Sequence, residues 1–236
     1  MIKKQGVAGL IITPESHDED HNAKLLMDME KSGIPVVFVD RDAKYQDFDA
    51  VLLDNIKGSF DAVNALLDEG HERIAIIAGP EFYKSGKERL NGYKTALEKR
   101  GIPIEKELIM RGDFQRQSGY EKTKEILKME KRPTAIFISN NYMTLGCIAA
   151  LTENGIKTPE DIAIIGFDDV DIFKMLGMNI SVVNRPTTQM GAEAATLLFQ
   201  KIKTDGSQRV CKTTLLSATL ELRGSEKYIQ TTRKEL

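Results

Sequence analysis

Short runs of consecutive apolar residues alternate along the chain with longer segments in which apolar residues recur at helical spacing. A continuous apolar run indicates a strand buried on both faces, as in a parallel sheet covered by helices, whereas strict alternation indicates a half-exposed strand. The runs predict seven strands, Val7–Thr13, Pro35–Asp40, Asp49–Asp54, Arg73–Gly79, Glu107–Gly112, Thr134–Ser139 and Ile162–Phe167.

The segments between these runs predict helices. Several of them end at a glycine in the position expected of a helix stop, as in "KSGIP", "DEGHE" and "KRGIP". Strands and helices alternating at this spacing are typical of a doubly wound α/β fold. Because seven parallel strands exceed what one small sheet needs, we expect two subdomains. The predicted helices are Ala23–Ser32, Ser59–Glu69, Lys87–Arg100, Ser118–Met129 and Met143–Asn154.

The chain from Ile180 onward has a different pattern. "ISVVNRP" predicts a strand, Thr187–Thr204 a helix, and "KTTLLSATLELRG" one strand whose alternating character suits a sheet edge. After Gly224 no apolar period remains, so we expect a loose end there.

Composition narrows the class of protein. With 236 residues, 41% of them hydrophobic, the chain can form two small domains with real cores. The formal net charge of −2 gives no basic surplus that points to nucleic acid. Cys147 and Cys211 have no metal-ligand spacing and are expected to be buried, reduced thiols. Since we expect neither a signal peptide nor a membrane span of roughly 20 apolar residues, these features predict a soluble, cytoplasmic protein.

Polar residues follow the predicted strands at the ends where ligands bind in open α/β sheets. An arginine fork, a carboxylate, an amide and an aromatic face suit a small ligand rich in hydroxyl groups or ring nitrogens. We therefore expect a ligand cleft at these strand ends. The residues collected there are Thr13, Asp40, Arg41, Asp54, Asn55, Ser85, Arg89, Phe114, Asn140, Asn141, Asp168 and Asp169.

Each of these residues also has a purely structural explanation. Asp168 or Asp169 can cap the next helix, and one of Asn140 and Asn141 is expected to be an N-cap in any case. Arg89 can be a solvated side chain on a charged helix face.

Other polar features are weaker signals. Phe114 can belong to the core, and His71 is expected to interact with the end of the preceding helix. The stretch "HDEDHN" places two histidines four residues apart, but a solvated loop explains it better than a metal site.

Enzyme signatures are missing. The sequence has neither a glycine-rich phosphate loop after a strand nor a G-x-S-x-G elbow, and its three histidines do not follow a strand beside a candidate nucleophile. We therefore predict a binding protein that needs no cofactor and holds no metal, rather than an enzyme.

Eight stretches, in order, resemble the effector-binding core of LacI/GalR-type bacterial transcription regulators, and the resemblance extends over nearly all of residues 6–225. They are "GIPVVFVDR", "LLDNIKGSFDAVNALLDEGHERIAIIAGP", "RLNGYKTALEKRGIP", "GDFQRQSGY", "RPTAIFISNNYMTLGCIAALTENGI", "PEDIAIIGFDD", "ISVVNRPTTQMGAEAATLLF" and "LELRGS".

The resemblance implies a fold like that of periplasmic sugar-binding proteins, with two α/β subdomains flanking a ligand cleft. It places residues 1–70 and 186–214 in an N-terminal subdomain, residues 71–185 and 215–225 in a C-terminal one, and residues 226–236 in a loose tail. Crossings are expected near Gly70, Arg185–Pro186 and Thr213–Leu216. The ligand-facing positions of the family fall on Asp40, Asp54, Ser85, Arg89, Phe114, Asn140 and Asp168.

Regulators of this family bind sugars, sugar phosphates or nucleobases and pass that binding to operator DNA through a homodimer. The apolar helix Met143–Leu151 resembles a dimer-contact helix of the family, although it can equally be a core helix.

The sequence departs from the family at its start, where it shows no helix-turn-helix headpiece, no hinge helix and no equivalent of the first strand and helix pairs. The resemblance therefore implies an incomplete N-terminal sheet with an exposed edge at Val7–Thr13, and operator contact only through a headpiece absent from this chain. The rival interpretation is the solute-binding protein of a sugar importer.

Overall fold

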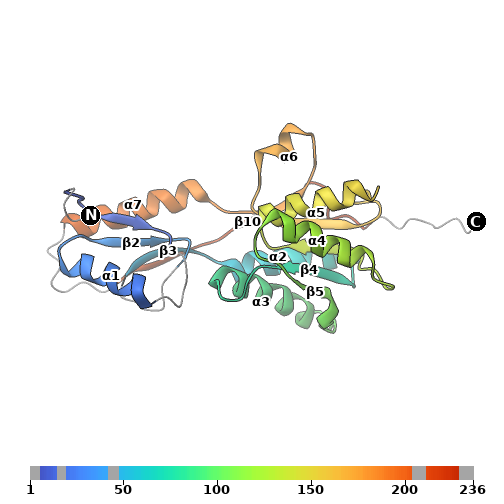
Figure 1. The fold of residues 1–236 in the computed structure, drawn as a ribbon, viewed down its shortest axis with the longest axis horizontal. Helices are drawn as coiled ribbons and strands as arrows, with labels where there is room; N and C mark the ends of the chain where they lie inside the picture. The colour runs from blue at the N-terminus through green and yellow to red at the C-terminus, as the bar shows by residue number, and fades with distance from the viewer. Residues whose placement is uncertain (1–5, 15–19, 42–47, 204–210, 229–236) are drawn as a thin grey trace, which may run out of the picture. The chain divides into compact units, whose positions relative to one another are not determined.

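The computed structural model of the chain describes residues 6–14, 20–41, 48–203 and 211–228. The chain divides into two compact units, each with its own sheet (Figure 1). Unit 1 comprises Met1–Asp54, Phe82–Lys84 and Pro186–Ser217, and unit 2 comprises Asn55–Glu81, Ser85–Arg185 and Ala218–Leu236.

Unit 1 is built on a four-stranded, wholly parallel sheet in the order β1-β2-β3-β9. Side chains of alternate residues lie on opposite faces of these strands. One face packs on Leu26 and Met29 of α1, and α7 packs on β1, β2 and β3. The elements are β1 (Leu10–Ile12), α1 (Asp20–Lys31), β2 (Val36–Val39), β3 (Asp49–Leu53), α7 (Thr187–Lys203) and β9 (Thr213–Leu216).

Unit 2 has a six-stranded sheet in the order β10-β8-β7-β6-β4-β5, parallel except for β10. The central strands are buried throughout, which explains their continuous apolar character. The elements are α2 (Asn55–Asp68), β4 (Ile74–Ala78), α3 (Lys84–Lys99), the 3-10 helix η2 (Lys106–Leu108), β5 (Ile109–Arg111), α4 (Arg116–Leu127), β6 (Ala135–Ile138), α5 (Asn141–Glu153), β7 (Ala163–Phe167), α6 (Asp171–Met175), β8 (Ser181–Asn184) and β10 (Thr219–Glu221).

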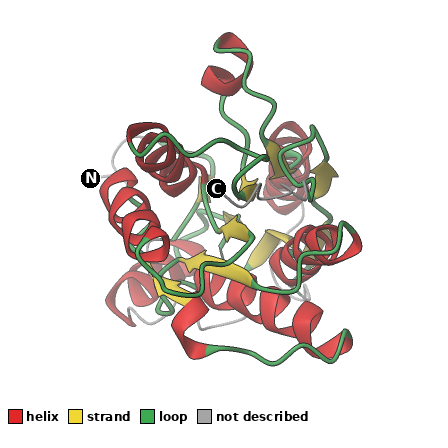
Figure 2. Ribbon diagram, turned by 90° about the vertical axis from the view of Figure 1, so that its right-hand side faces the viewer, coloured by secondary structure: helices red, strands yellow, loops and turns green. Residues whose placement is uncertain are grey.

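The doubly wound α/β prediction is confirmed, but three details differ. The strand predicted over residues 212–224 is two edge strands, β9 in unit 1 and β10 in unit 2, because the chain changes units at Ser217–Ala218. The short helix α6 was not predicted, and it stands away from the sheet of unit 2 (Figure 1 and Figure 2). The first crossing lies at Asp54–Asn55 instead of near Gly70.

Helix α2 explains the shifted crossing. It packs on β6, β7, β8 and β10, so it belongs to unit 2 and not to the N-terminal unit. A Cβ atom at Gly58 would lie 3.1 Å from Val183 and 3.2 Å from Ala218, which shows how closely the helix approaches the sheet. The crossing predicted at Arg185–Pro186 lies there.

The segment after Gly224 is packed into unit 2 as far as Tyr228, so the predicted loose tail does not begin at residue 226. Ser225 and Glu226 are buried, and the Ser225 hydroxyl donates to the Ile164 carbonyl at 2.7 Å. His71 lies 3.0 Å from the carbonyl oxygen of Glu226 through Nε2. Residues 229–236 lie outside the described residues.

His71 contacts the end of the preceding helix through its backbone, whose N–H donates to the Leu66 carbonyl at 3.1 Å, as expected, whereas its ring contacts other groups. Its Nδ1 atom lies 2.9 Å from the Thr134 hydroxyl, and its ring meets that of Tyr228 edge-on at 4.8 Å. The ring is buried because the C-terminal segment covers it. Burial lowers the pKa of His71, which favours the neutral imidazole.

Cys147 is buried as predicted, but Cys211 is exposed. None of the helices that the structure describes is long and apolar enough to cross a membrane.

Candidate functional site

The strand order of unit 2 places a topological switch point between β4 and β6, because β4 connects to β5 on one side and pairs with β6 on the other. In doubly wound sheets ligands bind beyond the carboxyl ends of the strands at this point. The residues that follow β4, β5, β6 and β7 in this unit therefore define the candidate site.

Arg89 is the centre of this group. It lies on α3 and is 4% exposed, so the alternative of a solvated arginine is wrong. Its Nε donates to the Asn55 side chain at 2.9 Å, and its Nη1 donates to the Ser139 carbonyl at 2.6 Å. The guanidinium carbon lies 3.6 Å from the ring centroid of Phe167, a cation–π contact that helps to stabilise the buried charge.

Asp168 follows β7 directly and is 8% exposed. One carboxylate oxygen lies 3.9 Å from Nη1 of Arg89, too far for a hydrogen bond. Both oxygens accept from Arg185, at 2.6 Å from Nε and 3.0 Å from Nη2. This two-point pairing fixes the plane of the carboxylate beside Arg89.

Asp169 has a separate arginine. Arg223 donates to its two oxygens at 3.1 Å and 2.6 Å, and Lys174 lies 3.2 Å away. The hydrogen bonds from Arg223, followed by Lys174, hold the pKa of Asp169 below its usual range against the opposing effect of burial. The residue before α6 is Val170, and no side chain caps this helix, so neither acid is its N-cap.

Asn140 is the N-cap of α5, as one of the two asparagines was expected to be. Its side-chain oxygen accepts from the Met143 N–H at 3.0 Å. Its amide nitrogen donates to the Phe114 carbonyl at 2.9 Å, so the same side chain also holds the segment after β5.

Phe114 adopts a φ of 67°, which a bulky side chain rarely does. Its ring lies against Gly79 at the end of β4, where a Cβ atom would meet it at 2.1 Å. The ring also packs on the core of unit 2, so the core alternative is correct in part. Glycine at position 79 is what allows the ring to lie over the strand end.

For the remaining predicted residues, the structure gives the position on the strand or helix. Ser85 is buried in the first turn of α3, one turn before Arg89. Asp40 and Asp54 follow the neighbouring strands β2 and β3 of unit 1, so both lie at the carboxyl end of that sheet. Asp40 also has a positive φ, of 69°.

Two arginines of this network were not predicted. Arg185 follows β8, so the expectation that ligand-binding residues follow the strands of an open α/β sheet, here called the strand-end rule, would have included it if applied to β8 as well. Arg223 lies after an antiparallel edge strand, where the rule gives no signal. Asn55, which the sequence places beside Asp54, proves to be a direct partner of Arg89.

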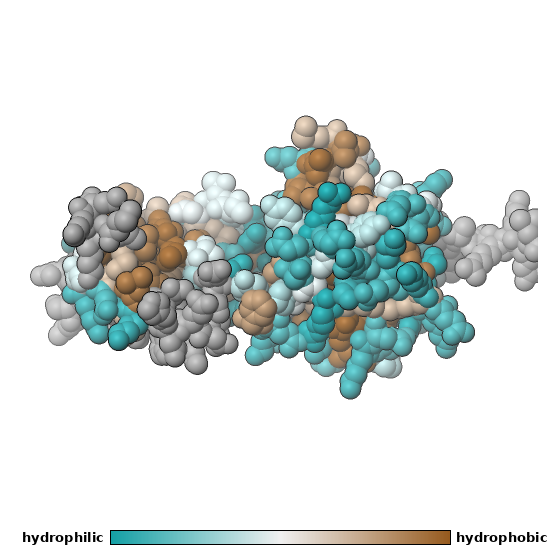
Figure 3. Space-filling model, in the orientation of Figure 1, coloured by the Kyte–Doolittle hydropathy of each residue, from teal (hydrophilic) through white to brown (hydrophobic). Residues whose placement is uncertain are grey.

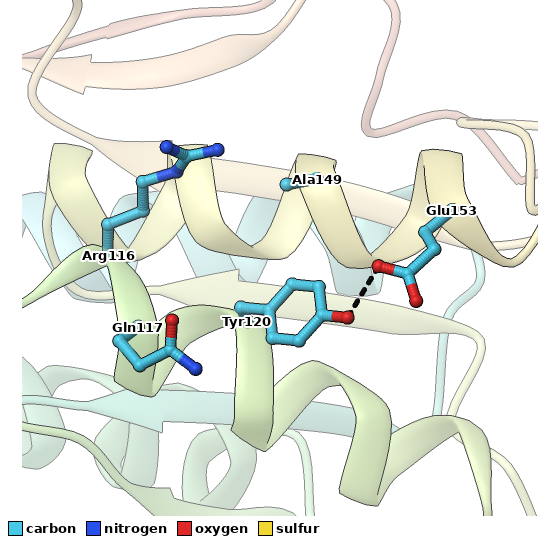
Figure 4. A pocket seen from close by; sticks show the side chains of 5 residues that line it. All are labelled: Arg116, Gln117, Tyr120, Ala149 and Glu153. Carbon is cyan, nitrogen blue, oxygen red and sulfur yellow. Dashed lines mark hydrogen bonds between the residues drawn. The ribbon is translucent and has the colours of Figure 1, made fainter.

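A pocket of about 450 Å³ lies elsewhere in unit 2, between α4 and α5 (Figure 4). Tyr120 donates a hydrogen bond to Glu153 at one end, and the lining residues are Arg116, Gln117, Tyr120, Ala149 and Glu153. Its charged residues are exposed, in contrast to the buried Arg89, so the strand ends remain the better candidate site.

No group of three His, Cys, Asp or Glu side chains in the described part of the chain could hold a metal ion. The stretch "HDEDHN" falls on residues 17–22, whose side chains lie outside the described residues.

Residues 63–226 match the periplasmic binding protein-like domain family. The chain is 34% identical over 195 residues to the HTH-type transcriptional repressor CytR of Escherichia coli K12, covering 83% of this chain and 57% of that protein. It is 31% identical to the HTH-type transcriptional repressor PurR of Pasteurella multocida, covering 89% and 62%. The chain thus spans less than two thirds of these relatives.

Solved structures show the same fold. A regulatory protein of the LacI family from Chloroflexus aggregans superposes with a TM-score of 0.83 at 32% identity, covering 95% of this chain and 78% of that one. The complex of the transcriptional regulator CelR with cellobiose gives a TM-score of 0.83 at 31% identity, covering 95% and 67%.

Proposed function

Since the chain belongs to the periplasmic binding protein-like domain family, in the form found in LacI-family repressors, we propose that it is the effector-sensing part of such a regulator. The effector is a small, polar molecule such as a sugar, sugar phosphate or nucleobase. It binds at the strand ends through Asp40, Asp54, Ser85, Arg89, Phe114, Asn140 and Asp168, a set to which we add Arg185.

One observation carries this assignment. Among the described residues, three that are not glycine have a positive φ, namely Asp40, Phe114 and Asp168. All three follow strands at the predicted site. Such conformations cost of order 1–3 kcal/mol each and persist where the surroundings enforce them, which is typical of ligand-binding positions.

The spacing of Arg89 and Asp168 indicates the chemistry of the ligand. The nearest atoms of the two groups are 3.9 Å apart, and the Arg185 pairing holds the carboxylate in place. A hydroxyl group can accept from a guanidinium and donate to a carboxylate at the same time. A ligand with neighbouring hydroxyl groups therefore suits this pair, and the Phe114 ring can cover an apolar face of it.

Signalling then follows from differential affinity. An effector that binds one conformation of the protein better than another shifts the population toward that conformation. We propose that the shift reaches operator DNA through a homodimer and a helix-turn-helix headpiece outside this sequence, and that the regulator acts in the cytoplasm. The chain by itself is expected to give no specific shift with operator DNA.

The homodimer contact proposed here is α5, which has Glu153 as its one charged residue. Tyr142 on this helix is 58% exposed, and α6 and the residue that follows it expose Met175 and Leu176. Hydrophobic colour gathers over the projecting α6 in Figure 3. Exposed apolar patches of this kind are typical of protein–protein contacts.

Calorimetric titration of the purified chain with sugars, sugar phosphates and purines tests the proposal. Saturable binding of one class, with no turnover of the bound compound, is expected. Turnover would make the protein an enzyme. Recovery of the protein from a periplasmic fraction would favour the solute-binding alternative.

A further inference from the structure

Two residues that hold the central pair of the site also lie where the chain changes units. Unit 2 begins at Asn55, directly after the Asp54–Asn55 crossing, and its longest segment ends at Arg185, directly before the Arg185–Pro186 crossing. Asn55 accepts from Nε of Arg89 at 2.9 Å, and Arg185 donates to both oxygens of Asp168. Each member of the pair is thus bonded to the residue at one of these two crossings.

The side chain of Asn55 is held in one orientation. It is buried, and its amide nitrogen donates to Glu88 at 3.0 Å while its oxygen accepts from Arg89. An amide donates only through its nitrogen and accepts only through its oxygen, so these two partners on α3 determine which way it points. Because Asn55 is the first residue of α2, a shift of Arg89 acts directly on the start of that helix.

Arg185 connects Asp168 to the start of α7. Its two-point pairing fixes the guanidinium against the carboxylate. The next residue is Pro186, which restricts the backbone of Arg185 to extended conformations. The Pro186 carbonyl accepts from the Met190 N–H at 2.9 Å and so continues into the first turn of α7. A movement of the Asp168 carboxylate therefore acts on a restricted connection.

The Asp54–Asn55 crossing is also bonded to the last connection of the chain. Within unit 1 the Asp54 N–H donates to the Leu216 carbonyl at 2.8 Å, just before the crossing at Ser217–Ala218. Within unit 2 a Cβ atom at Gly58 of α2 would lie 3.2 Å from Ala218. A restraint on Asn55 therefore reaches this connection as well.

The central pair itself is the open point of this chain of contacts. The nearest atoms of Arg89 and Asp168 are 3.9 Å apart, beyond hydrogen-bond range. A ligand hydroxyl that accepts from Arg89 and donates to Asp168 would complete a continuous series of bonds from Asn55 to Arg185. Hinges between domains are formed by a few residues at the ends of elements, as these two residues are. Bound effector would thus restrain both crossings at once.

We propose that Asn55 and Arg185 are the coupling residues of this protein, through which an effector held between Arg89 and Asp168 restrains the backbone at the Asp54–Asn55 and Arg185–Pro186 crossings. The inference rests on the effector site proposed above and adds the route from that site to the connections between the units. Conformations in which both crossings are restrained are then the ones that the effector favours.

Hydrogen–deuterium exchange of the full chain tests the proposal. The probes are sugars, sugar phosphates and purines, beginning with cellobiose, ribose 5-phosphate and adenine. Each protein is measured without compound and with a binding compound at about 100 times its dissociation constant for that protein, so that differences in affinity do not enter. In the wild type, bound compound should slow exchange by roughly threefold or more in peptides covering residues 50–58 and 182–189.

Two variants should separate the crossings. Asn55→Ala should lose the ligand-induced protection of residues 50–58 and keep that of residues 182–189, because only the bond to Arg89 is removed. Arg185→Lys should show the reverse, because lysine cannot hold both oxygens of Asp168. A variant that merely loosened the fold would speed exchange in both peptides, with and without compound.

The chain offers a matched control for each variant. Asn64 lies on α2 like Asn55, accepts from Arg100 at 3.1 Å and donates to Asp68 at 3.1 Å, but lies far along the helix from the crossing. Arg223 holds Asp169 in the same two-point manner as Arg185 holds Asp168. Asn64→Ala and Arg223→Lys should leave both protections unchanged.

The outcomes distinguish the coupling from the effector site. Binding without protection at either crossing, or the same loss of protection in the control variants, would overturn the coupling and leave the effector site in place. Loss of all binding in Asn55→Ala would make Asn55 part of the binding site and would overturn its separate role. If no compound binds the wild type, the proposed function fails and the coupling fails with it.

Discussion

Arg185 holds both carboxylate oxygens of Asp168, at 2.6 Å from Nε and 3.0 Å from Nη2. The next acid, Asp169, is held in the same two-point manner by Arg223. Two adjacent acids at the end of β7 thus have different arginines and different tasks. The Asp169 pair ties the strand end to the C-terminal segment, and the Asp168 pair presents a fixed carboxylate beside Arg89.

Effector affinity should depend on both members of this central pair. We expect Asp168→Ala and Arg89→Lys each to weaken binding by about 2–4 kcal/mol, the range for losing a partner of a buried, charged hydrogen bond. Lysine keeps the charge at position 89 but loses the planar fork. Titration calorimetry measures the change.

Lys174→Ala is the control for these variants, because Lys174 is exposed and contacts Asp169 instead of Asp168. It should leave affinity unchanged. If Asp168→Ala and Arg89→Lys both bind within about twofold of the wild type, a difference of roughly 0.4 kcal/mol, the site lies elsewhere.

Asn140 should have a structural and a positioning effect that can be separated. Asn140→Ala removes the N-cap of α5 and is expected to cost about 1 kcal/mol of unfolding free energy. Asn140→Asp keeps the cap oxygen but loses the donor to the Phe114 carbonyl. It should retain most of the stability lost in the alanine variant while still weakening effector binding. Equal affinity of Asn140→Asp and the wild type would contradict the role of Asn140 in positioning Phe114.

His71 should make stability depend on pH. Because burial lowers its pKa in the folded state, the unfolded chain takes up a proton on this residue more readily. The unfolding free energy should therefore fall as the pH drops below about 6.5, the ordinary histidine value. Thermal melts of the wild type and His71→Gln between neutral and mildly acidic pH measure the difference. The variant should show a flatter profile there, and identical profiles would exclude His71 as the cause.

The two thiols should react very differently. Burial raises the pKa of Cys147 to about 12, and Cys211 is exposed. A thiol reagent at neutral pH should label one cysteine per native chain, and Cys211→Ser should abolish that labelling. Labelling of Cys147 at a comparable rate would mean that α5 opens from the sheet under native conditions.

Local signals predicted most of the fold. The buried strands β4, β6 and β7 read as continuous apolar runs, and each was placed correctly. The division into units was harder to predict, because the spacing of apolar residues in α2 would be the same whichever sheet the helix covered. Its packing on β6, β7, β8 and β10 in the folded chain assigns it to unit 2. The short α6 gave no periodic signal.

The strand-end rule placed residues on the correct ends but could not show how they pair. The sequence alone could not decide whether Arg89 is solvated or buried, since a charged helix face is compatible with both. Its burial follows from Asn55, Ser139 and Phe167, which come from three different elements. Arg185 was not predicted because it follows β8, a strand whose end was not among those expected to line the cleft.

The most direct test of the effector site is thermal unfolding of the chain with sugars, sugar phosphates and purines, repeated with Asp168→Ala. A ligand at about 100 times its dissociation constant should stabilise the fold by about 2.7 kcal/mol, a shift of a few degrees in Tm. We predict that one compound class raises the Tm of the wild type and has no effect on the variant. A shift of equal size in both proteins, or no shift with any compound, would contradict an effector site centred on Arg89 and Asp168.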